Sequence, residues 1–93
     1  MDFEWDDRKA RENIAKHGVS FEFATRAFED PKLVLAEDLV HGRTEPRYFA
    51  FGRVPGGVLT VRFTIRVDRV RIIGAGFWRK GKGFYEEANY LHG

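Results

Sequence analysis

The sequence predicts an α+β fold in which two N-terminal helices pack on an antiparallel sheet of about four to five strands, followed by a short C-terminal helix. Two observations carry this prediction. The first third of the chain places apolar residues at helical spacing between capping residues. From residue 33 the period changes to two, and the residues become β-branched and aromatic. A chain of 93 residues is long enough for one core only, so we expect a single domain over residues 1–93.

The N-terminal third is expected to form a short strand and two helices. MDFEW alternates apolar and polar residues as a strand does, and an aspartate at 6 or 7 can cap a helix that ends at Lys16 or His17. Gly18 then supplies the left-handed stop of this helix. The second helix begins at the cap residue Ser20 and is ended by the EDP of residues 29–31.

Four further strands are expected after the second helix. They are LVLA (33–36), RYFAFGRV (47–54), VLTVRFTIRV (58–67) and RVRIIGA (69–75). The tight link at Asp68 and Arg69 predicts that the last three form an antiparallel meander. The strand at 58–67 has an aliphatic face, whereas Thr60, Arg62, Thr64 and Arg66 share the other face. Such a sheet has one side for helices and one side for a polar ligand or for water.

The segment RIIGAGFWRKGKGFYEE, residues 71–87, is interpreted as the end of the last strand, a flexible basic bend and the start of the terminal helix. That helix is expected to dock through Phe84, Tyr85 and Leu91. The glycines do not form a dinucleotide motif, which needs a parallel βαβ unit. They do not form a Walker loop either, because Gly83 stands where the magnesium-binding hydroxyl should be. We therefore expect no cofactor.

The same segment holds candidate RNA-binding residues. Arg79, Lys80 and Lys82 carry positive charges that suit phosphate oxygens, and Trp78 can stack on a base. The alternative is that Trp78 and its neighbour Phe77 fill the core beneath a basic surface that binds nothing.

Charge and composition narrow the classes of function. Residues 1–46 hold seven Lys/Arg against eleven Asp/Glu, while residues 47–93 hold nine against three. The basic half favours a polyanionic partner. The chain has no cysteine and three scattered histidines, so no metal site is expected. It lacks a long apolar run, and we expect a cytoplasmic protein without a membrane partner.

The loop HGRTEPR brings together His41, Arg43, Glu45 and Arg47 just before a strand. Metal-free RNA cleavage needs a base for the 2′-hydroxyl, a positive group for the phosphorane and an acid for the leaving 5′-oxygen. This loop contains such groups, and Tyr85 is a further candidate for the acid. The alternative is that Glu45 only pairs with an arginine of the sheet.

Several segments together resemble the BrnT toxins of bacterial type II toxin–antitoxin systems. These segments are FEWDDRKARENIAKHGVSFEFATRAFEDP, DLVHGRTEPRYFAFG, LTVRFTIR and RIIGA, which span nearly the whole chain in order. The resemblance implies a RelE-like fold and a small ribonuclease that blocks translation. It also implies a ribbon-helix-helix (BrnA-like) antitoxin as partner, with operator DNA bound only through the antitoxin complex.

Residue by residue, the resemblance carries the family's polar site positions onto His41, Glu45, Arg47, Thr64 and Arg66. Most relatives continue their last strand as RIISAR where this chain reads RIIGAG, so Gly76 stands in place of an arginine. We therefore hold two hypotheses. The first is a metal-independent endoribonuclease in which Arg79 or Lys80 replaces the missing arginine, and the second is a catalytically impaired relative that binds RNA or the antitoxin.

Overall fold

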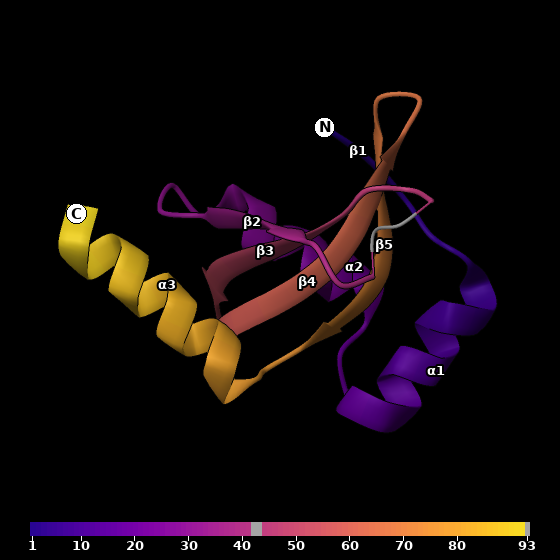
Figure 1. Cartoon of the computed structure of the whole chain (residues 1–93). Coiled ribbons are helices and arrows are strands. Elements are labelled where there is room, and N and C mark those ends of the chain that lie inside the picture. Colours follow the sequence, from indigo (N-terminus) through magenta and orange to yellow (C-terminus); the bar gives the residue numbers. More distant parts are fainter. Residues whose placement is uncertain (42–43, 93) are drawn as a thin grey trace.

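The computed structural model describes residues 1–41 and 44–92 (Figure 1). In chain order the elements are β1 (Asp2–Glu4), α1 (Asp7–His17), α2 (Phe21–Ala24), the 3₁₀ helix η1 (Thr25–Glu29), β2 (Val34–Asp38), β3 (Arg47–Val54), β4 (Gly57–Arg66), β5 (Arg69–Gly76) and α3 (Arg79–His92). The strands form one five-stranded sheet in the order β1-β5-β4-β3-β2. The predicted α+β fold, with helices before and after the long strands, is confirmed.

Strands β3, β4 and β5 form the antiparallel meander that the tight links between them predicted, and β2 extends it by pairing antiparallel with β3. Strand β1 lies at the other edge and pairs with β5 in parallel, with Asp2 opposite Arg69 and Glu4 opposite Arg71. Parallel neighbours need a long connection between them, and here almost the whole chain provides it. The sequence pattern predicted the first strand but not this pairing.

The capping residues of the two N-terminal helices are those predicted from the sequence. The side chain of Asp6 accepts a hydrogen bond from the backbone N–H of Lys9 at 3.0 Å, and Gly18 ends α1 with φ of 68°. The hydroxyl of Ser20 accepts from the N–H of Phe23 at 3.0 Å. The second helix tightens into the 3₁₀ geometry of η1, a common way for a helix to end.

The main core lies between the N-terminal helices and one face of the sheet. Phe21 from α2, Leu59 and Val61 from β4 and Ile72 from β5 are at most 1% exposed. Each side chain of this kind stabilises the fold by about 1.5–3 kcal/mol through burial. Gly52 lets η1 approach β3 closely, because a β-carbon there would run into the backbone of Ala27.

Helix α1 also closes the part of the β5 edge that β1 does not reach. The amide of Asn13 donates to the carbonyls of Val19 and Ala75, at 2.9 Å each, and accepts from the N–H of Ala75 at 3.1 Å. Asn13 is buried, and these bonds satisfy polar groups that would otherwise destabilise the fold. They fix the end of α1, and therefore His17, beside the end of β5.

Helix α3 lies on the opposite face of the sheet from α1 and α2 (Figure 1). It begins at Arg79, so the prediction of a flexible basic bend before a later helix is wrong. Gly81 explains the early start, since a β-carbon there would meet the hydroxyl of Thr60 and the ring of Phe51. The close packing overrides the low helix propensity of glycine. The side chain of Leu91 lies outside the described residues.

The link between β4 and β5 differs from the sequence prediction in one respect. The sequence predicts a strand that runs to Val67, with Val67 on its aliphatic face, but β4 ends at Arg66. Val67 and Asp68 form the turn, with φ of 48° and 67°, and Val67 is 94% exposed. Two-residue hairpin turns require left-handed residues to match the twist of the strands, which removes Val67 from the core.

Within the described residues, no helix is both long and apolar enough to span a bilayer.

Candidate functional site

Part of the sheet face that carries α3 is left uncovered, and arginines line it. Phe49 pairs with Arg62, Thr64 with Arg71, and Arg66 with Arg69, so these side chains project from the same face. Arg47, two residues before Phe49, joins them. We call this uncovered surface the arginine face, defined by Arg47, Arg62, Arg66, Arg69 and Arg71.

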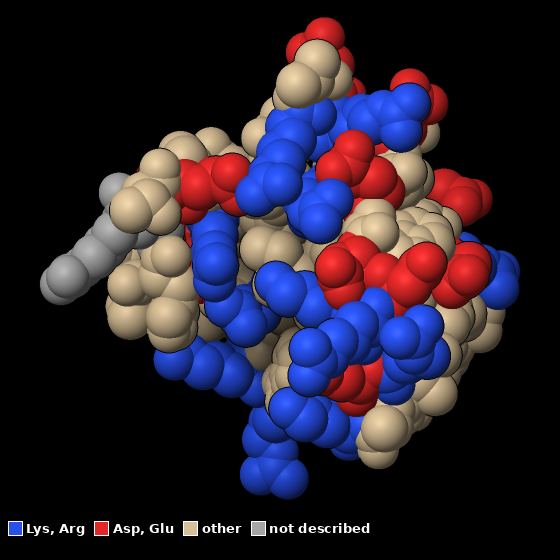
Figure 2. Space-filling model, turned by 90° about the vertical axis from the view of Figure 1, so that its right-hand side faces the viewer, with Lys and Arg blue, Asp and Glu red and all other residues tan. Residues whose placement is uncertain are grey.

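Figure 2 views the molecule from the right-hand side of Figure 1 and shows Lys and Arg side chains next to one another over much of it, with Asp and Glu between them. A surface of this kind attracts phosphates, and the interspersed carboxylates hold individual guanidinium groups in position.

The first constellation on this face is Asp38, His41 and Arg62. The Oδ1 atom of Asp38, at the end of β2, accepts from the backbone N–H groups of Val40 and His41 at 3.1 and 3.2 Å. Its Oδ2 atom lies 3.1 Å from Nδ1 of His41 and 3.9 Å from a terminal nitrogen of Arg62. The Asp38 side chain is 4% exposed, whereas that of His41 is 59% exposed. A buried carboxylate therefore presents an exposed imidazole.

This arrangement determines which nitrogen of His41 is free. Burial raises the pKa of Asp38, but the hydrogen bonds from His41 and Val40 outweigh it and hold that pKa below its ordinary value. An ionised carboxylate only accepts hydrogen bonds, so Nδ1 of His41 must carry the proton that it donates. In a neutral imidazole with this tautomer the lone pair lies on Nε2, which can then act as a base.

The second constellation joins the loop before β3 to the end of β4. Arg66 donates from Nε and Nη2 to the two carboxylate oxygens of Glu45, at 3.1 and 3.4 Å. These hydrogen bonds lower the pKa of Glu45 below its ordinary value, against the effect of burial, and the charge of Arg66 adds to them. The hydroxyl of Thr64 donates to the carbonyl of Pro46 at 2.7 Å and fastens the loop to β4.

A third ion pair borders the site, because Arg71 donates to Glu4 of β1 at 2.7 Å. The chain thus presents three guanidinium groups beside the carboxylates of Asp38, Glu45 and Glu4 along one transverse strip of the sheet, and the last two carboxylates are hydrogen-bonded to their arginines. Bidentate and charge-assisted contacts of this kind suit phosphate oxygens, and the imidazole of His41 lies at the end of the strip.

The structure brings together six of the residues predicted from the sequence, namely His41, Glu45, Arg47, Arg62, Thr64 and Arg66. It adds Asp38, which the sequence reasoning missed. The spacing of Asp38 three residues before His41, in EDLVH, is the usual signal of an aspartate that accepts from the following backbone N–H groups. Arg43 of the same loop lies outside the described residues.

Tyr85 does not belong to this group. Its ring packs with Phe51 and Val58, and Val58 and Arg66 are at opposite ends of β4, roughly 26 Å apart along an extended strand. Its hydroxyl donates to Asp30 at 2.6 Å. Burial raises the pKa of Tyr85, and the Asp30 carboxylate raises it further, so the phenol is a poor proton donor. Tyr85 therefore lies apart from the arginine face.

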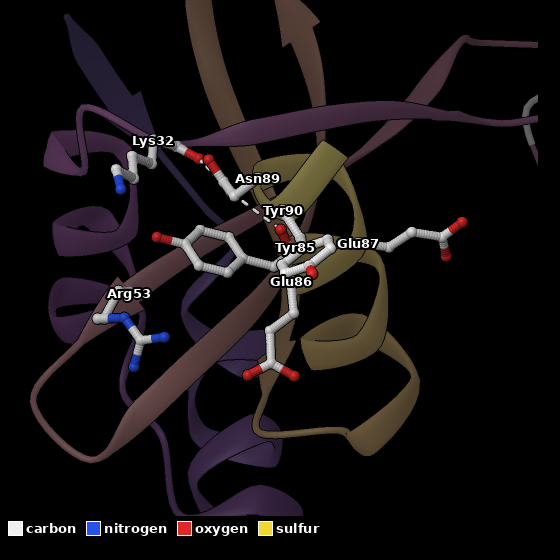
Figure 3. A pocket seen from close by; sticks show the side chains of 7 residues that line it. All are labelled: Lys32, Arg53, Tyr85, Glu86, Glu87, Asn89 and Tyr90. Carbon is white, nitrogen blue, oxygen red and sulfur yellow. Dashed lines mark hydrogen bonds between the residues drawn. The ribbon is translucent and has the colours of Figure 1, made fainter. Parts of the chain in front are cut away.

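A surface hollow of about 640 Å³ adjoins Tyr85, not the arginine face. Figure 3 shows its lining, which includes Arg53 and Asn89. The guanidinium of Arg53 lies 5.5 Å from the centre of the Tyr85 ring, and Asn89 donates to the carbonyl of Lys32 at 3.2 Å. These contacts fasten α3 to β3 and to the segment before β2.

The remaining candidates lie at the start of α3. Arg79, Lys80 and Lys82 are exposed in its first turns, where the helix fixes the positions of their backbones. Trp78 directly precedes the helix and is 37% exposed. It does not fill the core, because its indole covers Gly76 and contacts His17 at the surface.

Among the side chains described in residues 1–41 and 44–90, no three His, Asp or Glu residues gather as a metal-binding group.

The family model described as the ribonuclease toxin BrnT of type II toxin–antitoxin systems matches residues 5–81, which include α1, the long strands and the first residues of α3. A search of curated proteins finds no significant match.

Proposed function

Because the chain belongs to the BrnT family of ribonuclease toxins of type II toxin–antitoxin systems, we propose that it cleaves RNA on the arginine face without a metal ion, by attack of the 2′-hydroxyl. The observation that carries this proposal is the Asp38–His41 pair beside Arg62, which combines an oriented base with a fixed positive charge.

In the first step, Nε2 of His41 takes the proton of the 2′-hydroxyl, and the 2′-oxygen forms a bond to phosphorus. Arg62 and Arg66 bind the non-bridging oxygens and stabilise the extra negative charge of the five-coordinate phosphorane. The bond from phosphorus to the 5′-oxygen then breaks, that oxygen takes a proton from water, and the resulting hydroxide takes the proton held by His41. The products are a 2′,3′-cyclic phosphate and a 5′-hydroxyl.

Glu45 has a positioning role in this proposal. Its lowered pKa keeps it ionised near neutral pH but makes it a weaker base, since basicity falls with pKa. Its two oxygens hold Nε and Nη2 of Arg66. The outer Nη1 group of Arg66 then remains available for phosphate, and Arg47 supplies a further positive charge from the neighbouring strand.

The direct test uses purified protein and a single-stranded oligoribonucleotide, in the presence of EDTA. We expect cleavage that ends in a cyclic phosphate, and no cleavage at positions whose 2′-hydroxyl is methylated. His41→Ala and Arg66→Ala should each reduce the rate by at least about 10²-fold. Arg11→Ala, which removes an exposed arginine of α1, is the matched control. Cleavage that needs a divalent metal, or full activity of Arg66→Ala, would contradict the proposal.

Expression in cells tests the toxin activity by the same comparison of the wild type with Arg66→Ala. Induction of the wild-type chain without antitoxin should stop growth and fragment RNA, whereas the Arg66→Ala variant should allow growth. Normal growth with intact RNA in cells that make the folded wild-type protein would argue against a toxin.

A second candidate function is binding of RNA or antitoxin without cleavage. The observation that favours it is Gly76, which stands where the resemblance places an arginine. The indole of Trp78 occupies the space that a side chain there would enter. Protein that binds RNA with a steep salt dependence but leaves it full length would select this function.

The antitoxin partner that the family implies is proposed to be a ribbon-helix-helix protein, with operator DNA bound through that partner. The arginine face suits an acidic segment of such a protein, so antitoxin and RNA should compete for it. Because the antitoxin and RNA are both found in the cytoplasm, we propose that the protein acts there. Loss of antitoxin binding in Arg62→Ala, with Arg11→Ala unchanged, is the expected result.

A further inference from the structure

The indole of Trp78 lies directly over Gly76. A β-carbon at position 76 would lie 2.7 to 2.9 Å from three atoms of the indole, which are Cζ2, Cη2 and Cε2. Three similar distances mean that the added atom would point at the flat side of the ring. Glycine is therefore the residue that allows the indole to cover the end of β5.

A second contact fixes the indole. The ring of His17 meets the ring of Trp78 at 78°, with 5.0 Å between the centroids. His17 is itself held in place, because Gly18 ends α1 and the side chain of Asn13 ties the helix to Ala75. Trp78 nevertheless remains 37% exposed. Part of this aromatic surface is therefore open to solvent.

This aromatic surface adjoins the arginine face. Gly74 pairs directly with Arg62, and Gly76 is two residues farther along the same face of β5. Diagonal neighbours of this kind in an antiparallel pair lie about 7–8 Å apart. Arg79, Lys80 and Lys82 follow Trp78 on the first turns of α3 and are exposed. The indole is thus placed between Arg62 and a second group of cations.

We propose that Trp78 is a nucleobase-stacking subsite for single-stranded RNA whose backbone lies along the arginine face. A charged track with an aromatic ring beside it is how proteins bind single strands, since every base has a flat face that can stack. In this arrangement Arg62 and the α3 cations contact phosphates on either side, and the base between them lies on the indole. His17 and Gly76 are positioning residues for the ring.

The inference rests on the proposed RNA function, so the experiment separates the two. Two short oligonucleotides of equal length carry 2′-O-methyl groups throughout, which prevents cleavage. One has all its bases, and the other has abasic residues along its central part. Binding of each to the wild type and the variants is measured by fluorescence anisotropy at one fixed salt concentration, after circular dichroism has shown that each variant is folded.

The expected results are specific to the base. Trp78→Ala should bind the complete oligonucleotide roughly 5- to 100-fold more weakly than the wild type, and should bind the abasic one equally well. Trp78→Phe should keep most of the affinity. Gly76→Ala should also lose base-dependent affinity although Trp78 is still present, because the new β-carbon displaces the indole. Tyr90→Ala removes a more exposed aromatic ring from the end of α3 and should change nothing.

A Trp5→Phe background adds an independent measurement. The chain has two tryptophans, so replacement of Trp5 leaves Trp78 as the single one. Trp5 packs against Phe21, and phenylalanine keeps an aromatic ring at that position. The complete oligonucleotide should then quench the fluorescence, and the abasic one should not.

Other outcomes would contradict either the stacking subsite alone or the RNA function as well. If Trp78→Ala weakens binding to both oligonucleotides equally, or to neither, the stacking subsite is wrong, while the RNA function stands as long as Arg62→Ala weakens both. If the folded wild type binds neither oligonucleotide, the RNA function fails and the subsite fails with it.

Discussion

The buried carboxylate of Asp38 accepts hydrogen bonds from both the ring and the backbone of His41. The two residues are three positions apart, and the turn between them brings Nδ1 to 3.1 Å from Oδ2. A histidine on an exposed loop would otherwise sample many orientations. Here Nδ1 is bound by Asp38, whose carboxylate also lies 3.9 Å from a terminal nitrogen of Arg62.

Asp38→Asn should slow RNA cleavage by about 10²- to 10⁴-fold, the range in which positioned acid–base groups act. An amide can donate as well as accept, so it no longer forces the proton onto Nδ1 of His41. Single-turnover rates as a function of pH measure the effect. The double variant with His41→Ala should be no slower than His41→Ala alone.

Glu37→Gln is the control for this prediction, because it changes the neighbouring carboxylate of β2, whose side chain points to the other face. A folded Asp38→Asn protein that cleaves at the wild-type rate would show that His41 does not depend on Asp38.

Tyr85→Phe should leave the cleavage rate unchanged and lower the free energy of unfolding by about 1–2 kcal/mol. The change removes a hydrogen bond to the charged Asp30 carboxylate but keeps the ring in its packing with Phe51 and Val58. Urea denaturation and cleavage kinetics on the same preparation separate the two effects. Reduced cleavage with unchanged stability would return Tyr85 to the catalytic site.

Two glycines of α3 should respond oppositely to alanine. Gly83→Ala should raise the free energy of unfolding by up to about 1 kcal/mol, because nothing lies within 4 Å of the new β-carbon and alanine favours the helix. Gly81→Ala should lower it by about 1–3 kcal/mol, because the β-carbon meets Thr60 and Phe51 and forces the helix away from the sheet. Thermal melting of the pair measures the difference, and equal shifts would mean that α3 does not pack closely.

Acid should destabilise the protein partly through Asp30. Burial raises the pKa of this carboxyl, but hydrogen bonds from Tyr85 and from the backbone N–H groups of Arg53 and Lys32 hold it below the ordinary value of 3.8. A carboxyl whose pKa is lowered by folding stabilises the native state above its unfolded pKa, and this contribution is lost as the pH falls through the folded value.

The difference in unfolding free energy between the wild type and Asp30→Asn should therefore be largest above about pH 5 and shrink below pH 4. Denaturation series between pH 7 and pH 3 measure it, with Glu29→Gln as the control for removing a neighbouring negative charge. A difference that stays constant over this range would show that Asp30 is not stabilised in its ionised form.

Local signals in the sequence were sufficient for much of the fold. Asp6, Gly18 and Ser20 define helix ends through their own backbone and side-chain bonding, and the period of two defines the strands, so both were predictable. The start of α3 was not. A helix through two glycines contradicts local propensity, and it forms because Gly81 fits against Thr60, a residue of another element.

The candidate site was also predictable from the sequence only in part. Alternation along β4 placed Arg62, Thr64 and Arg66 on one face, and the HGRTEPR loop identified His41 and Glu45. The sequence alone also carried the family resemblance. Only the tertiary structure shows which partners these groups have, because the pairing of the strands brings Arg66 next to Glu45 and Arg62 next to Asp38. It also shows that Tyr85 lies at the far end of the sheet, where it contacts Asp30. Pairing across strands depends on contacts between residues far apart in the chain, so only the folded structure fixes it.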